Sequence, residues 1–192
     1  MLTKEVSLET GKKALKELDR SPEVGIVMGS DSDLEVMEET ASVLKKFGVT
    51  YEMTVVSAHR NPKRAADFAS SAQKRGIKVI VAGAGHAAHL AGTMAAFSRL
   101  PVIGVPIDSS CLQGIDSLLS TVQMPPGVPV ATVSIGKPGA RNAGILAVQI
   151  LALSNQKLTK MLEAFKEELA EQVDQKAKKL KDSSSRPDTS HA

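Results

Sequence analysis

The stretch from Ser57 to Arg60 places an imidazole and a guanidinium beside a hydroxyl group, directly after the predicted strand 51–56 and shortly before Pro62. The His59 imidazole can take up and release a proton near neutral pH. The Arg60 guanidinium can hold a phosphate through two parallel hydrogen bonds. These residues predict a site for proton transfer and anion binding. The alternative is an exposed His-Arg pair in a turn before a proline.

A second polar stretch, Gly-Ser-Asp-Ser-Asp at 29–33, separates the apolar run 24–28 from a segment with apolar residues at helical spacing. The hydroxyls of Ser30 and Ser32, with the free N–H groups of a helix start, predict a phosphate-binding site. The Asp33 carboxylate beside them suits sugar hydroxyls. The alternative interpretation is that these Ser and Asp side chains only cap the helix.

A third candidate stretch, 81–92, ends an apolar run in glycines and continues into an alanine-rich segment with two histidines. Glycines between a strand and a helix let a ligand approach the backbone closely. The spacing differs from the dinucleotide-binding pattern, and no acidic partner follows at the expected distance. His86 and His89, three residues apart, are expected to share one face of a helix. Because no third ligand is evident, we expect no metal there.

The elements that must position these stretches alternate along the chain. Strands are predicted at 24–28, 51–56, 77–82, 101–105 and 128–133, and helices at 34–47, 63–75, 87–98, 116–122 and 139–153. Such alternation with apolar strands is typical of a doubly wound α/β domain whose parallel sheet is covered on both faces. Ligands bind such sheets beyond the carboxyl ends of the strands. The three polar stretches are therefore expected to meet in one crevice.

The ends of the chain are predicted to lie outside this domain, which we place at 21–155. Residues 1–20 are expected to form an N-terminal extension, and 182–192 a disordered tail. The segment 156–181 predicts a long helix with one apolar stripe, formed by Leu158, Leu162, Phe165, Leu169, Val173 and Leu180. That stripe packs either on a neighbouring subunit or on the chain's own core.

The composition argues against several classes of protein. The chain has 192 residues and a net charge of +3, from 24 basic and 21 acidic residues. With no Trp and one Tyr, no aromatic platform accompanies that charge, so we expect no nucleic-acid binding. No apolar run is long enough to span a membrane. The single Cys111 excludes an internal disulfide, as expected of a cytoplasmic protein.

Six blocks in order resemble the PurE family of purine biosynthesis, in particular its class I N5-carboxyaminoimidazole ribonucleotide mutases. They are GIVMGSDSD, VVSAHRNP, VIVAGAGHAAHLAG, LPVIGVPIDSS, DSLLSTVQMPPGVPVATVSIG and GARNAGILAVQIL. The resemblance covers residues 23–154. It implies a flavodoxin-like three-layer sandwich with a five-stranded parallel sheet, an additional C-terminal helix, and a homo-octamer whose active sites are completed by adjacent subunits. It also implies carboxyaminoimidazole ribonucleotide as substrate, with no cofactor and no metal.

The resemblance also implies residue roles by position. His59 would be the general acid and base of carboxyl transfer from N5 to C4, and Asp33 would hold the ribose hydroxyls. The 5′-phosphate would be held by Ser30, Ser32, Ser57 and Arg60. The pocket for the carboxylate or CO2 would be lined by Ala84 and Gly85, with His89 and Leu90 beside it.

Three positions depart from the family pattern: His86 replaces a Gly, Ala91 a Pro and Asn61 a Thr. The runner-up activity is that of the carboxylase class, which adds CO2 directly to aminoimidazole ribonucleotide. Members of that class carry a Lys after the SAH motif, so Arg60 favours the mutase. Outside enzymes, the alternatives are a flavodoxin-like nucleotide-binding module without catalysis, and an interaction protein built on the C-terminal helix.

Overall fold

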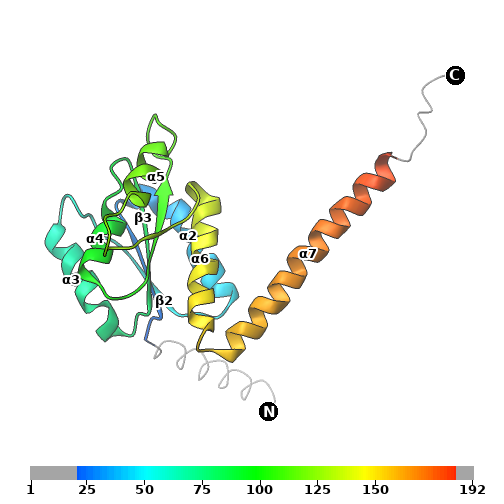
Figure 1. Ribbon diagram of the computed structural model, residues 1–192, viewed down its shortest axis with the longest axis horizontal. Helices are drawn as coiled ribbons and strands as arrows, with labels where there is room; N and C mark the ends of the chain where they lie inside the picture. The colour runs from blue at the N-terminus through cyan, green and yellow to red at the C-terminus, as the bar shows by residue number, and fades with distance from the viewer. Residues whose placement is uncertain (1–20, 185–192) are drawn as a thin grey trace, which may run out of the picture. The chain divides into compact units, whose positions relative to one another are not determined.

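The computed structural model describes residues 21–184 and forms a five-stranded α/β domain followed by a long helix (Figure 1). The strands are β1 (Val24–Met28), β2 (Tyr51–Val55), β3 (Val79–Gly85), β4 (Val102–Ile107) and β5 (Ala131–Thr132). The α-helices are α2 (Leu34–Lys46), α3 (Pro62–Ala72), α4 (Leu90–Phe97), α5 (Ile115–Val122), α6 (Gly136–Ala152) and α7 (Gln156–Ser184). Short 3-10 turns, η1 (Asp31–Asp33) and η2 (Gln73–Arg75), lie before α2 and after α3.

The sheet has the order β2-β1-β3-β4-β5 with every pair parallel. This is the flavodoxin-like order, in which the chain reverses its direction of winding between β1 and β3. At this point Met28, the last residue of β1, pairs with Val55, the last residue of β2, and with Gly83, two residues before the end of β3. The loops that follow β1, β2 and β3 therefore leave the sheet at the same edge, and the expected α/β fold is confirmed.

Helices cover both faces of the sheet, as continuous apolar strands require. Helices α2 and α6 lie on one face, with α3, α4 and α5 on the other (Figure 1). One helix pair is joined by the Thr40 hydroxyl, which donates to the Ala140 carbonyl over 2.7 Å. Alanine and glycine in α6 permit this approach, because a side chain on Gly144 would press against Val43. The opposite core contains Val27, Ile80, Ala82, Ala69, Leu90 and Met94.

Several element boundaries differ from the sequence-based expectation, among them those around the third and fifth strands. Strand β3 continues through the glycines to Gly85, because Ala84 and Gly85 still pair with Pro106 and Ile107 of β4. Helix α4 accordingly starts later, at Leu90. Strand β5 is only two residues long, where a run of six was predicted. Each difference depends on a contact with a distant strand, which local patterning does not reveal.

The described residues divide into two compact units, with the boundary between Ile150 and Leu151. Most of the second is α7, which continues to Ser184 and so includes three residues of the predicted disordered tail. The predicted extension 1–20 and residues 185–192 lie outside the described residues. Between residues 21 and 184, none of the helices combines the length and apolar character needed to cross a membrane.

Candidate functional site

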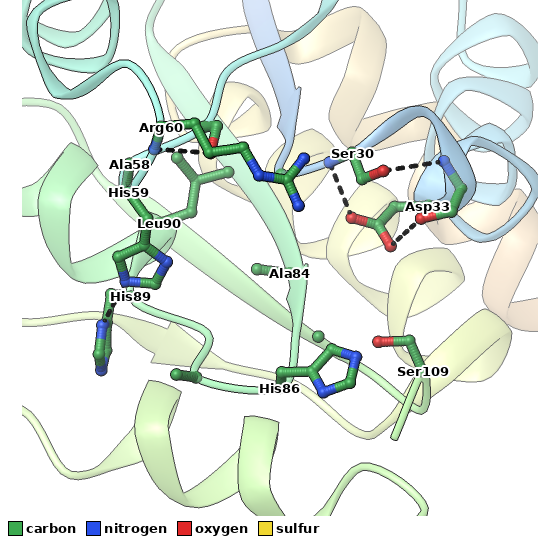
Figure 2. A pocket seen from close by; sticks show the side chains of 15 residues that line it. Ser30, Asp33, Ala58, His59, Arg60, Ala84, His86, His89, Leu90 and Ser109 are labelled. Atoms are coloured by element: carbon green, nitrogen blue, oxygen red, sulfur yellow. Dashed lines mark hydrogen bonds between the residues drawn. The ribbon is translucent and has the colours of Figure 1, made fainter. Parts of the chain in front are cut away.

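A cavity of about 550 Å³ lies at the carboxyl edge of the sheet, where the loops after β1, β2 and β3 meet (Figure 2). It is lined by all ten residues that were predicted as catalytic or substrate-binding: Ser30, Ser32, Asp33, Ser57, His59, Arg60, Ala84, Gly85, His89 and Leu90. Further lining residues are Gly29, Ala58, His86, Ala87 and Ser109. The predicted convergence of three polar loops is thus present in the structure, while the roles of the residues stay predictions.

The first loop combines the two interpretations that its sequence left open. Ser30 and Asp33 form a capping box: the Ser30 side chain accepts from the Ser32 N–H over 3.3 Å, and the Asp33 carboxylate accepts from the Ser30 N–H over 3.1 Å. These side chains nevertheless line the cavity. The cap therefore fixes the loop in the shape that presents its hydroxyls to a ligand.

Asp33 is the most buried charged group of the cavity, with 4% of its surface exposed. Burial raises the pKa of its carboxyl above the ordinary 3.8, while hydrogen bonds from Ser30 and Ser32 oppose that rise. The carboxylate is thus a hydrogen-bond acceptor that is shielded from water at the N-terminus of α2. A pair of vicinal hydroxyls could replace the water it has lost.

The second loop is held by its own hydrogen bonds. The Arg60 N–H donates to the Ser57 hydroxyl over 3.2 Å, and Asn61 caps α3 by accepting from the Arg64 N–H over 3.1 Å. The departure at Asn61 therefore preserves a capping side chain. Figure 2 shows the Arg60 guanidinium extending across the cavity toward the Ser30 loop. Two loops thus offer hydroxyls and a fixed positive charge to one anion.

The two imidazoles of His59 and His89 contact each other directly. The His59 Nε2 lies 2.7 Å from the His89 Nδ1, and the rings meet edge to face at 84°. One of these nitrogens carries the shared proton, and the other accepts it. The His89 carbonyl accepts from the Thr93 N–H in the first turn of α4. His89 therefore links the His59 ring to a regular element.

The third loop corrects one sequence-based prediction. His86 precedes α4 and His89 is its N-cap, so the two residues do not share a helical face. His89 turns to His59 instead, and His86 lies beside Ser109 (Figure 2). Within the described part of the chain, no group of three or more His, Cys, Asp or Glu side chains is placed to hold a metal ion.

Ser109 is a lining residue that the sequence reasoning did not find. It follows β4, whose carboxyl end meets the same edge of the sheet, and that position was the available signal. A side chain on Gly85 would overlap the Ser109 Oγ. Because Gly85 has no side chain, the loop after β4 can approach the end of β3 and contribute Ser109 to the cavity wall.

The chain is similar to several known proteins. A family model described as AIR carboxylase matches residues 23–172. The N5-carboxyaminoimidazole ribonucleotide mutase of Pyrococcus horikoshii is 53% identical over 161 residues, which are 84% of this chain and 90% of that protein. The phosphoribosylaminoimidazole carboxylase of Saccharomyces cerevisiae is 53% identical over 175 residues, 91% of this chain but 30% of the yeast protein. The crystal structure of Treponema denticola PurE superposes with a TM-score of 0.75 at 29% identity, covering 83% of this chain and 99% of that one.

Proposed function

The chain belongs to the AIR carboxylase (PurE) family, and we infer that it is an N5-carboxyaminoimidazole ribonucleotide mutase of purine biosynthesis. It is an isomerase, which moves a carboxyl group from N5 to C4 of the aminoimidazole ring. The observation that carries this conclusion is that His59 lines the same cavity as the buried Asp33 carboxylate and the Arg60 guanidinium. The cavity thus places a side chain that can carry a proton next to groups that can bind a nucleotide.

The proposed binding mode follows the chemistry of the three loops. The Ser30, Ser32 and Ser57 hydroxyls and the Arg60 guanidinium suit the 5′-phosphate. The buried Asp33 carboxylate suits the ribose hydroxyls. With these ends held, the imidazole ring extends toward His59 and the end of β3.

The proposed reaction has two steps and one proton carrier. Protonated His59 donates to N5 as the bond between N5 and the carboxyl carbon breaks, which releases CO2 and leaves neutral aminoimidazole ribonucleotide. The ring carbon C4 then attacks the CO2 carbon, and neutral His59 removes the proton from C4. His59 ends protonated, as it began. No electrons are exchanged with an external group, so these steps require no cofactor.

Retention of CO2 is the main difficulty of this reaction. Free CO2 that left the cavity would have to be recaptured from dilute solution, so enclosure raises its effective concentration beside C4. Ala84, Gly85 and Leu90 give the cavity an apolar wall close to His89. We assign these four residues to the carboxylate and CO2 pocket.

The second candidate is direct carboxylation of aminoimidazole ribonucleotide by CO2. It is favoured by the name of the yeast relative, phosphoribosylaminoimidazole carboxylase. The chain matches only 30% of that protein, whereas it covers 90% of the Pyrococcus mutase. Both activities would use the same second step, and they differ in the origin of the CO2.

We further propose a homo-octamer acting in the cytoplasm, with sites completed by adjacent subunits. Helix α5 carries one row of exposed apolar side chains. Helix α7 also exposes apolar side chains, for example Val173, which is 63% exposed. The exposed row near α5 is Leu112, Ile115, Leu119 and Val122. Exposed apolar rows of this kind suit contacts between subunits.

The role of His59 is tested by the variant His59→Asn, which keeps a hydrogen-bonding side chain but cannot carry the proton. We expect kcat to fall by about 10²- to 10⁴-fold. Binding of the product nucleotide, measured by calorimetry, should stay close to that of the wild type, because the phosphate and ribose contacts remain. Near-normal turnover of the variant would exclude His59 as the acid and base.

A further inference from the structure

His86 lines the cavity in a backbone conformation that side chains rarely adopt. Its φ is +53°, in the left-handed region, and Gln113 at +50° is the other non-glycine residue there within the described chain. Most of the cavity wall around it consists of small residues. Residues held in such regions persist where their surroundings determine them, and they are frequent at ligand sites.

The neighbours of His86 come from a different part of the sequence. Figure 2 shows its imidazole at the end of β3, beside Ser109 from the loop that follows β4. Gly85, the preceding residue, lets Ser109 pack against the strand end. His86 therefore lies between the open cavity and the segment that leads from β4 to α5.

His86 is itself one of the residues that line the cavity. An imidazole in such a position can donate a ring N–H to a ligand, and a neutral imidazole still carries one N–H.

We propose that His86 is a substrate-binding residue that donates a hydrogen bond to the migrating carboxyl group. The proposal rests on the mutase function. Ser30, Asp33 and Arg60 hold the phosphate and ribose, so the carboxyl end of the ring faces the end of β3. The carboxyl group is anionic in both substrate and product, and it is retained as CO2 between them. A donor at this end stabilises the anion and keeps CO2 near C4.

The test uses carbamate substrate labelled with ¹³C in its carboxyl group, in buffer with unlabelled bicarbonate. Steady-state kinetics give KM and kcat, and mass spectrometry gives the fraction of label kept in the product. In His86→Gly we expect KM to rise about tenfold or more, since a hydrogen bond to a charged group is lost. We also expect label retention to fall. His86→Asn, which tolerates the same φ and keeps a donor, should recover part of both losses.

Matched variants separate binding from backbone effects. Gln113→Gly relieves the same kind of backbone strain outside the cavity lining, so it should leave KM and label retention unchanged. Wild-type KM and label retention in His86→Gly would overturn this inference while the mutase function stood. A wild-type protein that leaves the carbamate unchanged would overturn the function and the inference together.

Discussion

The hydrogen bond between His59 and His89 determines how the proposed acid and base is presented. The His89 Nδ1 is 2.7 Å from the His59 Nε2, so that one nitrogen of His59 is directed to its partner. The other ring nitrogen is left to face the substrate. Because His89 is anchored at the start of α4, the orientation of the His59 ring depends on a helix as well as on its own loop.

At the same scale, the buried Asp33 carboxyl gives the stability of the protein a pH dependence. Its folded pKa is raised by burial, so the folded state binds this proton more tightly than the unfolded state. Its contribution to stability is therefore greatest below the ordinary pKa of 3.8 and decreases as pH rises through the raised value. The variant Asp33→Asn lacks this titration.

We predict that the free energy of unfolding of the wild type, relative to Asp33→Asn, decreases as pH rises above about 3.8 and then becomes constant toward neutrality. Denaturant titrations of both proteins at a series of pH values measure this difference. A wild type that instead gains stability over the variant in this range would contradict the assigned effect of burial.

At the scale of elements, the cavity depends on how β3 ends. The strand stays paired with β4 to Gly85, and Gly85 leaves room for the Ser109 hydroxyl. Gly29, at the end of β1, has more space: a side-chain carbon there would meet only Asp33 at 3.7 Å and Ala84 at 3.9 Å. The two glycines lie at the ends of neighbouring strands and differ in the space around them, so they can be compared by the same substitution.

We predict that Gly85→Ala destabilises the protein by about 1–3 kcal/mol, because the new methyl group must displace Ser109 or the β4 end. It should also raise KM. Gly29→Ala is expected to change stability by less than about 1 kcal/mol, since its contacts are of ordinary van der Waals length. Thermal unfolding and steady-state kinetics on both variants test this, and equal effects would argue against close packing at Gly85.

Local patterning predicted the order and type of these elements, because apolar runs and helical periodicity are properties of neighbouring residues. It also placed Ser30, Asp33, His59 and Arg60 at strand ends, where the fold brings them together. It did not predict that β3 passes through its glycines, since that depends on pairing with Ile107. Ser109 was missed for the same reason: its position depends on the path of the chain from β4 to α5.

At the scale of the whole molecule, the proposed octamer is expected to depend on α7. Within the described part of this helix, Leu169 and Val173 expose apolar side chains that the separate chain leaves in water. The deletion of residues 156–192 removes the helix and the residues that follow it in the sequence, and leaves the sheet intact. We predict a smaller assembly, measured by analytical ultracentrifugation, with a loss of activity if subunits share sites. An intact octamer after deletion would assign assembly to other surfaces such as the α5 row.

The central claim, carboxyl transfer within one nucleotide, is tested most directly by the choice of substrate. The purified protein is supplied either with N5-carboxyaminoimidazole ribonucleotide at low bicarbonate or with aminoimidazole ribonucleotide and bicarbonate, and formation of the C4-carboxylated product is followed. The account predicts rapid product formation from the carbamate without added bicarbonate. Product only from aminoimidazole ribonucleotide at high bicarbonate would contradict it and identify a direct carboxylase.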